Sequence, residues 1–432
     1  MTQQNDIDEF FSTDRVSGRD EAIELSNGSY HDHLIDLDDP MLAEYRGMSY
    51  EEFTEDRYRA DFLRELLDYW KGLYDEPFVG VTSDGVVRES VYALPEVRVP
   101  DPAPAAAADR LLALLSPEQR SRLTYPLDAP EWRGWSNPEF VFFRNGLRLE
   151  DQHEEVAQAI LAVIEASLSP EGYARAREAM DLNGYLGELV DLPTIMNNRS
   201  YWFSLFGTPS ASEPWGWQLF GHHLALNFVT VGGRDVIAPQ FIGAEPALSD
   251  GERPPLFDAR EQLAIRLAES LSPAQRSEAV VYHSVLDPAM PEGRLHPADE
   301  RHVAGAFRDN RVVPYEGIRA TALDETQQRL LREIAADFLL LLREDQRALA
   351  LSEFDAQLSE TRFAWYGATD GTQPFYFRIH SPAILAELDH HAGVWLNNRL
   401  PARFHVHTTL RLPNGNDYGK ALLAQLSRRR AG

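Results

Sequence analysis

The sequence predicts an α+β protein in which helices cover an antiparallel or mixed sheet. Two regions, residues 215–241 and 375–410, contain runs of aromatic and branched apolar residues that are typical of strands. Residues 325–346 instead space leucines and charged residues as one long helix does. The chain has 432 residues, of which 44% are hydrophobic, so it can bury a core and is not disordered throughout. We therefore expect two domains, or one large α+β body with an appended segment.

The appended segment is predicted at the N-terminus. Residues 1–75 are expected to form an acidic helical arm, and residues 76–432 the α+β catalytic body. In the arm, aromatic residues and leucines at 50–53 and 62–70 have the spacing of amphipathic helices. Such helices cover an apolar surface, so we expect the arm to pack on the body or on a second copy of the chain, giving a homo-oligomer. The first twenty or so residues are expected to be mobile.

Turns and helix starts mark the elements that follow the arm. An Asp84–Gly85 turn between two apolar runs predicts a short hairpin over residues 78–88. Ser-Pro pairs at 116–117, 169–170 and 272–273 predict helix starts, because Ser caps free amides and Pro at the first helical position loses no needed donor. The first and third pairs either mark a duplicated helical unit or reflect repeated use of a good cap.

The C-terminal part is predicted to be β again, with one closing helix. Three runs have strand character, residues 375–379, 383–388 and 403–410. The last element, residues 419–430, ends in arginines, which complement the dipole at the C-terminus of a helix.

Composition excludes several classes of protein. A formal net charge of −27 would repel nucleic acid and anionic lipid, so neither is expected as a partner. The chain has no cysteine, which excludes disulfides, thiolate ligands and iron–sulfur clusters. The longest apolar run, residues 338–342, is too short to cross a membrane, and residues 1–6 lack the pattern of a signal peptide. We expect a cytoplasmic protein in which any metal ion binds imidazole and oxygen ligands.

Two histidines near the end of the chain are the most informative residues. Residues 404–411 are predicted as a strand, in which His405 and His407 share one face with Thr409 and Arg411. Two imidazoles about 6–7 Å apart along a strand face can bind one metal ion. The alternative is a polar strand face whose histidines hydrogen-bond to neighbours or solvent.

A second pair, His222 and His223, is adjacent in the sequence. On a strand the two rings would point to opposite faces, so at most one can bind the same ion as His405 and His407. We expect His222 to do so, with His223 orienting a substrate or another ligand. The predicted metal ligands are therefore drawn from His222, His223, His405 and His407.

Several separate segments share the pattern of one known family. They include Gly-His-His at 221–223 and His-Val-His at 405–407, within residues 135–137, 203–209, 215–228, 376–382, 387–389, 404–408 and 416–419. In this order they resemble the bacterial family called domain of unknown function 3500, from about residue 78 to the C-terminus. The resemblance implies that these segments converge in space, and it implies no particular reaction. His390 and His391 depart from the family pattern, which makes them the least transferable candidates.

Polar residues on neighbouring predicted strands suggest catalytic and substrate-binding roles. Glu387 could bind the metal, orient an imidazole, act as a general base or pair with an arginine. His380 could be a further ligand, an acid–base group or a structural residue at a turn. Arg411 could clamp a substrate carboxylate, and an ion pair with Asp417 would explain it equally well. We predict Glu387, His380 and Arg411 as catalytic, and Arg378 and Arg411 as substrate-binding.

These residues predict a metal-dependent enzyme that acts on a small carboxylate-bearing or amino-acid-like substrate. A mononuclear site without thiolate favours iron or copper and an oxidoreductase. One alternative is a zinc-type hydrolase or lyase, in which the ion lowers the pKa of its water and Glu387 takes the proton. The second alternative is a metal-binding protein without catalysis. The chain lacks a nucleophile elbow, a phosphate-binding loop, a dinucleotide fingerprint and a His-Glu-x-x-His helix.

Overall fold

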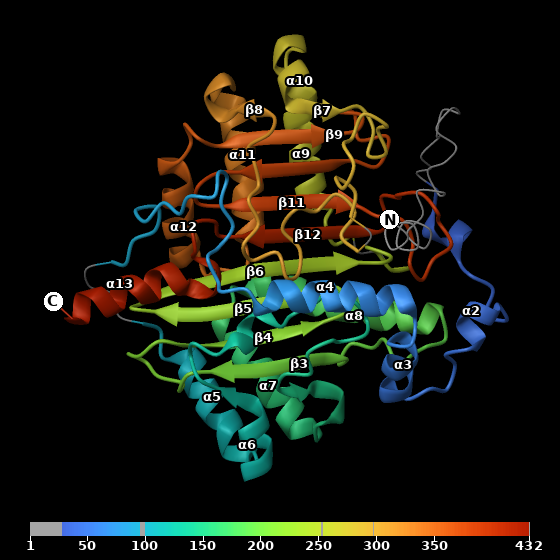
Figure 1. Cartoon of the computed structure of the whole chain (residues 1–432), viewed down its shortest axis with the longest axis vertical. Helices are drawn as coiled ribbons and strands as arrows, with labels where there is room; N and C mark the ends of the chain where they lie inside the picture. The colour runs from blue at the N-terminus through green and yellow to red at the C-terminus, as the bar shows by residue number, and fades with distance from the viewer. Residues whose placement is uncertain (1–27, 96–99, 252–253, 297, 432) are drawn as a thin grey trace.

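The computed structural model describes residues 28–431 except 96–99, 252–253 and 297 (Figure 1). The predicted mobility of the first twenty residues lies outside this part of the chain. The described residues form helices and a twelve-stranded mixed sheet, so the predicted α+β class is confirmed.

The N-terminal arm consists of short helices and one longer helix. They are the 3-10 helix η2 (Tyr30–His33), α2 (Pro40–Ala43), α3 (Tyr50–Arg57) and α4 (Asp61–Asp75). Ser49 begins α3 with a capping box, in which its hydroxyl and the Glu52 carboxylate each accept a backbone N–H. Helix α4 turns an apolar stripe toward the body, where Leu63, Leu66 and Trp70 are buried.

The body has two halves. The elements of the first half are α5 (Ala103–Leu114), α6 (Pro117–Leu123), β1 (Thr124–Tyr125), η3 (Pro130–Arg133), β2 (Leu147–Arg148), η4 (Leu149–Asp151), α7 (Glu154–Ser167), α8 (Pro170–Leu189), β3 (Tyr201–Phe206), β4 (Trp215–Gly221), β5 (Leu224–Val231) and β6 (Arg234–Ala244). Those of the second half are α9 (Asp258–Ser270), α10 (Pro273–Ala279), β7 (Val280–Tyr282), β8 (Ile318–Arg319), η5 (Ala320–Ala322), α11 (Glu325–Phe338), α12 (Glu344–Ala356), β9 (Arg362–Tyr366), β10 (Tyr376–His380), β11 (Leu385–His390) and β12 (Val406–Arg411). The chain then ends with η6 (Asp417–Gly419) and α13 (Lys420–Ala431).

The two halves repeat one order of elements and one pattern of pairing. In each half, two helices lead to a short strand that pairs in parallel with a later strand, β1 with β3 and β7 with β9. In each half a second short strand, β2 or β8, pairs antiparallel with that same later strand. A 3-10 turn and two helices come next, and then four antiparallel strands, of which β3 or β9 is the first. Ser116 and Ser272, from the first and third Ser-Pro pairs, cap the equivalent helices α6 and α10. The topology therefore favours the duplicated-unit interpretation of these pairs.

Strands β6 and β12 join the halves at the centre of the sheet. The strand order is β1-β3-β4-β5-β6-β12-β11-β10-β9-β7, with β2 on β3 and β8 on β9. Strands β6 and β12 are antiparallel, with Ala244 opposite Val406, and Val406 also lies opposite His390 of β11. The ends of β6 and β11 and the start of β12 therefore lie together at one end of the sheet, which carries the candidate site.

Both faces of the sheet are buried. One face packs against α5, α7, α8, α9 and α11 through an apolar core that includes Trp217, Phe228 and Phe377. The other face is covered by the arm, by irregular segments such as residues 129–141, and by α13. Figure 1 shows α4 in front of the middle of the sheet, α13 at the left-hand ends of the central strands, and α8, α9 and α11 behind the sheet. The cavity described below lies on the face that the arm covers.

Two local predictions were wrong for tertiary reasons. Residues 78–88 do not form a hairpin, because Thr82 pairs instead with the distant segment 311–313, and its carbonyl accepts the amide of Val313 at 2.7 Å. The single helix predicted over 325–346 is two helices, α11 and α12. The chain turns between them so that Leu341 and Leu342 are also buried.

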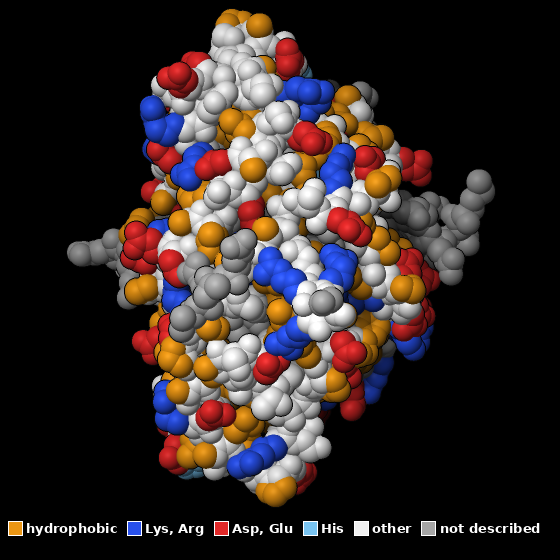
Figure 2. Space-filling view, turned by 90° about the vertical axis from the view of Figure 1, so that its left-hand side faces the viewer, with side chains coloured by type: hydrophobic (Ala, Val, Ile, Leu, Met, Phe, Trp, Pro, Cys, Tyr) orange, Lys and Arg blue, Asp and Glu red, His pale blue; other side chains and the backbone are white. Residues whose placement is uncertain are grey.

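The surface mixes acidic and basic side chains. Figure 2 shows both signs interspersed on the left-hand side of the molecule, with basic side chains gathered around the end of α13. The last turn of that helix contains Arg428, Arg429 and Arg430. Within the described ranges, no helix has both the length and the apolar character needed to cross a bilayer.

Candidate metal centre

A cavity of about 390 Å³ lies between the arm and the ends of the central strands. This volume is within the range of sites that bind small molecules. Its apolar wall includes Met41, Leu63, Leu66, Trp70, Phe140 and Trp395. Four histidines, His222, His223, His391 and His407, also line it. The cavity therefore combines an apolar wall with a group of imidazoles.

Three imidazoles from two distant segments meet at this cavity. His223 lies in the two-residue turn between β4 and β5, His405 directly precedes β12, and His407 is the second residue of β12. All three are buried, and one ligand atom of each lies within 4.8 Å of the other two. The Nε2 atoms of His405 and His407 are 3.0 Å apart. Two imidazoles at 2.0–2.1 Å from one tetrahedral ion have nitrogens about 3.3 Å apart, so a small shift allows both to bind one ion.

Backbone geometry and a glycine bring His223 to β12. His223 has a φ of 61°, in the left-handed region, and its carbonyl accepts the amide of Gly243 at 2.7 Å. Gly243 lies opposite His407 in the β6–β12 pair. A Cβ at Gly243 would lie 2.8 Å from Cδ2 of His407 and 3.0 Å from Cδ2 of His223. The missing side chain therefore makes room for both imidazoles.

Hydrogen bonds orient His405. Its Nδ1–H donates to the carbonyl of Ala392 at 2.7 Å, which leaves Nε2 to bind an ion, as is usual for metal-bound histidines. Glu245 holds the loop that contains Ala392, because its Oε1 accepts the amides of residues 394–396 at 2.8, 3.1 and 3.0 Å. Burial raises the pKa of Glu245 to about 7, although these amides act in the opposite direction.

Burial keeps the clustered imidazoles neutral. It lowers the pKa of His405 to about 4 and that of His222 to about 3. The pKa values of His223 and His407 lie well below the usual value for the same reason, and neighbouring imidazoles add to the effect. The neutral form is the one that binds metal ions.

His222 lies next to this group and outside it. Its Nδ1–H donates to Oδ1 of Asn183 at 2.7 Å, and its ring stacks on that of His223 with centroids 3.8 Å apart. The two rings are neighbours because the residues form a turn, whereas the predicted opposite orientation applies only to a strand. His223 rather than His222 is therefore the member of this pair that groups with His405 and His407.

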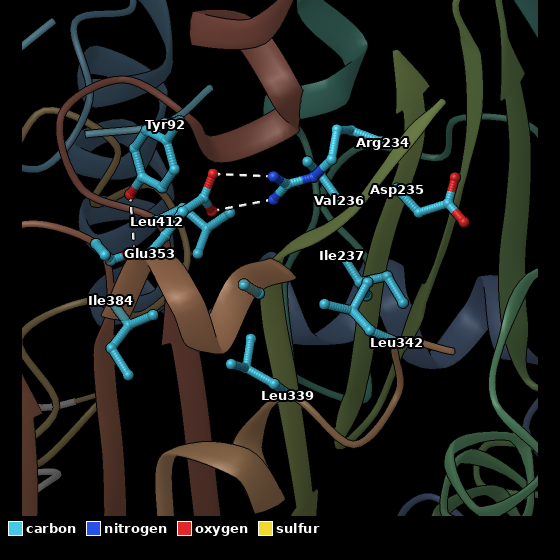
Figure 3. A pocket seen from close by; sticks show the side chains of 12 residues that line it. Tyr92, Arg234, Asp235, Val236, Ile237, Leu339, Leu342, Glu353, Ile384 and Leu412 are labelled. Carbon is cyan, nitrogen blue, oxygen red and sulfur yellow. Dashed lines mark hydrogen bonds and ion pairs between the residues drawn. The ribbon is translucent and has the colours of Figure 1, made fainter. Parts of the chain in front are cut away.

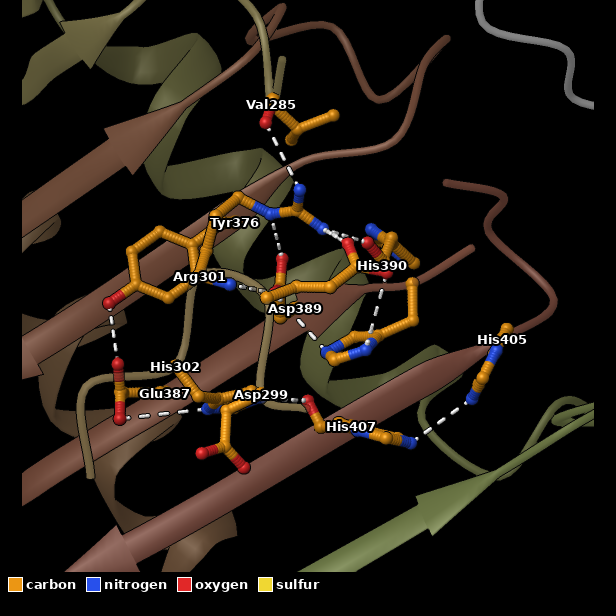
Figure 4. A network of polar contacts seen from close by, with 12 residues as sticks. Val285, Asp299, Arg301, His302, Tyr376, Glu387, Asp389, His390, His405 and His407 are labelled. Carbon is orange, nitrogen blue, oxygen red and sulfur yellow. Dashed lines mark hydrogen bonds and ion pairs between the residues drawn. The ribbon is translucent and has the colours of Figure 1, made fainter. Parts of the chain in front are cut away.

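A second group of potential ligands adjoins the first, and Figure 4 labels its members His302 and Asp389 together with His405 and His407. It consists of His302, Asp389 and His391, which are buried and whose ligand atoms lie within 4.8 Å of one another. The centroids of the His391 and His407 rings are 3.9 Å apart. Sequence patterns did not identify His302, because it lies in an irregular loop where side-chain alternation does not apply. His391 belongs to this second group, although the sequence at this position departs from the family pattern.

Glu387 supports the second group from β11. Its carboxylate accepts the hydroxyl of Tyr376 at 2.6 Å, the hydroxyl of Thr409 at 3.1 Å and the amides of residues 303–304 at 3.0 and 3.1 Å. Burial acts to raise its pKa, but the interactions with His302, Arg378 and Tyr376 together lower the pKa to about 2. An ionised carboxylate with this many donors fits a positioning role for His302 better than the predicted role of a general base.

Arg411 lies away from the histidines. It is four residues beyond His407 on β12, about 13 Å along the strand. Its guanidinium pairs with Asp309 at 2.5 Å and with Asp417 at 3.1 Å, so the alternative ion pair is present. Asp417 also accepts a hydrogen bond from the amide of Leu412. The predicted catalytic and substrate-binding roles of Arg411 do not fit this buried position.

His380, Arg378 and His390 also lie outside both groups. Arg378 pairs with Glu316 at 2.7 Å, and the ring of His380 packs on Tyr315 with centroids 4.5 Å apart. His390 is on the opposite face of β11, where its Nδ1 lies 2.8 Å from the carbonyl of Phe375. None of the three lines the cavity, so the roles predicted for His380 and Arg378 do not fit their positions.

A second cavity, between β6 and α12, is not a comparable site (Figure 3). Its volume is about 20 Å³, close to that of one water molecule. Arg234 donates to both carboxylate oxygens of Glu353 at 2.9 and 3.0 Å, and the Tyr92 hydroxyl donates to the carbonyl of Ala383 at 2.8 Å. Because the space is too small for a substrate and these side chains are already paired with protein groups, we assign them a structural role.

Comparison with known proteins identifies the family. A family model described as "Protein of unknown function (DUF3500)" matches residues 99–420. The match covers most of the chain, so the chain belongs to this family, and the predicted resemblance is confirmed. The matched region contains all six residues of the two ligand groups, whereas the arm precedes it. Searches of curated proteins and of solved structures found no match.

Proposed function

We propose that this DUF3500 protein is a metal-dependent enzyme in which His223, His405 and His407 bind one transition-metal ion. The observation that carries the proposal is the meeting of three buried imidazoles beside a cavity large enough for a small molecule. The Nε2 atoms of His405 and His407 face each other at 3.0 Å and share one hydrogen bond, which an ion bound by both would replace. Three protein ligands leave further positions of the ion open, as in catalytic sites.

We rank an oxidoreductase with iron or copper first. The ligands are imidazoles without thiolate, a set that suits iron and copper as well as zinc. Glu387, the base expected in a zinc mechanism, is occupied by hydrogen bonds and does not line the cavity. The position of Glu387 therefore argues against a hydrolytic mechanism in which Glu387 is the base. A bound iron or copper ion would supply electron transfer or the activation of oxygen.

The substrate is proposed to be a small carboxylate with an apolar part. Arg57 of α3 lines the cavity, and its buried Nε has no hydrogen-bond partner among the described residues. One of its terminal nitrogens lies 4.0 Å from Oε1 of Glu139, whose pKa is raised by burial. Arg57 can therefore bind a substrate carboxylate, the role expected of Arg378 and Arg411. The leucine and aromatic wall would contact the apolar part.

A zinc-type hydrolase or lyase remains the second candidate because of Glu300. This residue lines the cavity, unlike Glu387, and its Oε1 lies 3.6 Å from Nδ1 of His391, although its oxygens also accept the amide of Ala392 and the guanidinium of Arg301. A carboxylate at this position could accept a proton from a metal-bound water in place of Glu387.

Elemental analysis of the untagged protein tests the proposal. We expect metal in the wild type and its loss in His405→Ala and His407→Ala, with the far-UV circular dichroism retained, because only a ligand is removed. His380→Gln is the matched control, since it changes a buried histidine outside both groups, and it should keep the metal. A wild type that binds no metal, or a wild-type metal content in the two alanine variants, would contradict the proposal.

The identity of the metal separates the candidates. Iron or copper, together with oxygen uptake in the presence of small apolar carboxylates, supports the oxidoreductase. Stoichiometric zinc, with hydrolysis or elimination, supports the second candidate. A retained ion without any turnover would instead indicate a metal-binding protein without catalysis.

A further inference from the structure

His391 and Asp389 approach each other without a hydrogen bond, and their ligand atoms lie within 4.8 Å of one another and of one from His302. Nε2 of His391 lies 3.2 Å from Oδ2 of Asp389, but the arrangement lacks hydrogen-bond geometry. Nε2 of His391 has no hydrogen-bond partner among the described residues, and both side chains are buried. Buried polar atoms are normally paired. An imidazole nitrogen and a carboxylate oxygen that converge without bonding are suitable ligands for one divalent cation.

Neighbouring residues hold Asp389 in position for such a role. Nε of Arg301 donates to Oδ1 of Asp389 at 2.6 Å, and the backbone amide of Arg301 donates to Oδ2 at 3.1 Å. Arg301 also donates to the carbonyls of Val285 and His390, which fixes its own side chain (Figure 4). An ionised carboxylate has roughly four acceptor positions, so Asp389 can bind a cation in addition.

His302 completes this group and is also held from two sides. Its Nδ1 lies 3.6 Å from Oε2 of Glu387, and its Nε2 lies 3.2 Å from the carbonyl of His407. Figure 4 shows the His302 ring between Glu387 and His407. An outer contact orients a metal-binding histidine through one ring nitrogen, and the other nitrogen of His302 would have to exchange its present contact for the ion.

We propose that His302, Asp389 and His391 bind a second divalent cation beside the first, so that the cavity faces a two-metal centre. This inference rests on the function proposed above for the first ion. The two ligand groups adjoin through His391 and His407, which both line the cavity and whose rings are 3.9 Å apart. The mixture of nitrogen and oxygen ligands suits zinc, manganese or iron(II). Two adjacent ions can hold an oxygen-bearing group of a substrate, such as a carboxylate, from both sides.

Metal stoichiometry tests the second site. Full-length apo protein, prepared by dialysis against a chelator, is loaded with Zn²⁺, desalted and analysed by mass spectrometry. We expect two ions per chain in the wild type and in the control His380→Gln. His391→Ala and His302→Gln should each retain one ion. His223→Asn should also retain one, since it removes a ligand of the first ion and Asn tolerates the left-handed backbone.

The outcomes separate this inference from the proposed function. A wild type with one ion, unchanged in His391→Ala and lost in His407→Ala, would overturn the second site and leave the first intact. A wild type without any ion would overturn both. Two ions in the wild type that both persist in His391→Ala and His302→Gln would place the second ion elsewhere and overturn the inference.

A measurement on the wild type alone covers the case in which variants misfold. Two Mn²⁺ ions in adjacent sites interact magnetically, so their electron paramagnetic resonance spectrum differs from that of an isolated ion. We expect the coupled spectrum at saturation. The spectrum of isolated Mn²⁺ at full loading would overturn the two-metal centre.

Discussion

At the scale of single residues, space and backbone conformation select the histidines that form the site. His223 joins His405 and His407 because it adopts a left-handed conformation in a turn, whereas His222 hydrogen-bonds to Asn183. Gly243 contributes by having no side chain where two imidazoles approach its backbone. Residue type alone therefore does not distinguish a ligand from its neighbour.

Gly243→Ala is expected to weaken metal binding without removing a ligand. The added Cβ would lie 2.8 Å from Cδ2 of His407, too close for carbon atoms, so the ring must move. We expect the affinity for Zn²⁺ to fall by about tenfold or more, comparable with the loss of a group that orients a ligand. Isothermal titration calorimetry of the apo protein measures this change.

The matched control is Gly72→Ala, in α4. A Cβ there meets no heavy atom within 4 Å, and alanine favours a helix, so metal affinity should not change. Equal affinities of Gly243→Ala and wild type would mean that the ion binds away from His407.

At the scale of elements, the N-terminal arm completes the site. Helix α4 supplies Leu63, Leu66 and Trp70 to the cavity wall, and α3 supplies Arg57. These residues precede the region matched by the family model, so the arm sets the shape of a cavity whose histidines lie in the family region. Trp70 also stacks on Phe307, with ring centroids 5.2 Å apart, and thereby links the arm to the loop that carries His302.

Trp70→Ala is expected to lower the free energy of unfolding by about 3–5 kcal/mol, because the indole is 1% exposed and its removal leaves a hole between the arm and the loop. Urea unfolding followed by circular dichroism measures the change. The neighbouring exposed residue provides the control, and Lys71→Ala should alter the free energy by no more than about 0.5 kcal/mol. If the two variants behaved alike, α4 would not pack on the body in solution.

At the scale of the whole molecule, the proposed site lies where the two repeated halves meet. His223 belongs to the first half, and His405 and His407 belong to the second. The halves share one sheet through the β6–β12 pair. An ion bound by residues from both halves would therefore stabilise their association, because it binds the folded chain and not the unfolded one.

Metal removal is expected to destabilise the whole chain. At a free metal concentration about 1,000 times the dissociation constant, binding contributes about 4 kcal/mol to folding. Differential scanning calorimetry of the Zn²⁺-loaded protein should show a lower transition temperature after chelation, still as one cooperative transition because the sheet is continuous. His223→Asn should reduce this shift. Transition temperatures that do not respond to chelation would argue against ions that connect the halves.

Much of the fold follows from the sequence because it depends on local chemistry. Ser116 and Ser272 begin helices where a capping residue precedes proline, and the fold class follows from the separate helix and strand patterns. The hairpin predicted over 78–88 fails because Thr82 pairs with a segment more than two hundred residues away, at 311–313. Local pattern identifies an extended segment and does not identify its partner.

The sequence by itself determined the chemistry available to the site: a chain without cysteine, with a pair of histidines two residues apart at the start of a strand. Only the tertiary structure decided which other residues join them. It brought in His223, His302 and His391, and it left His380 and Arg411 elsewhere. The physical reason is that the period of a strand sets the face on which a side chain lies, whereas strand register, turn conformation and loop packing set its position on that face.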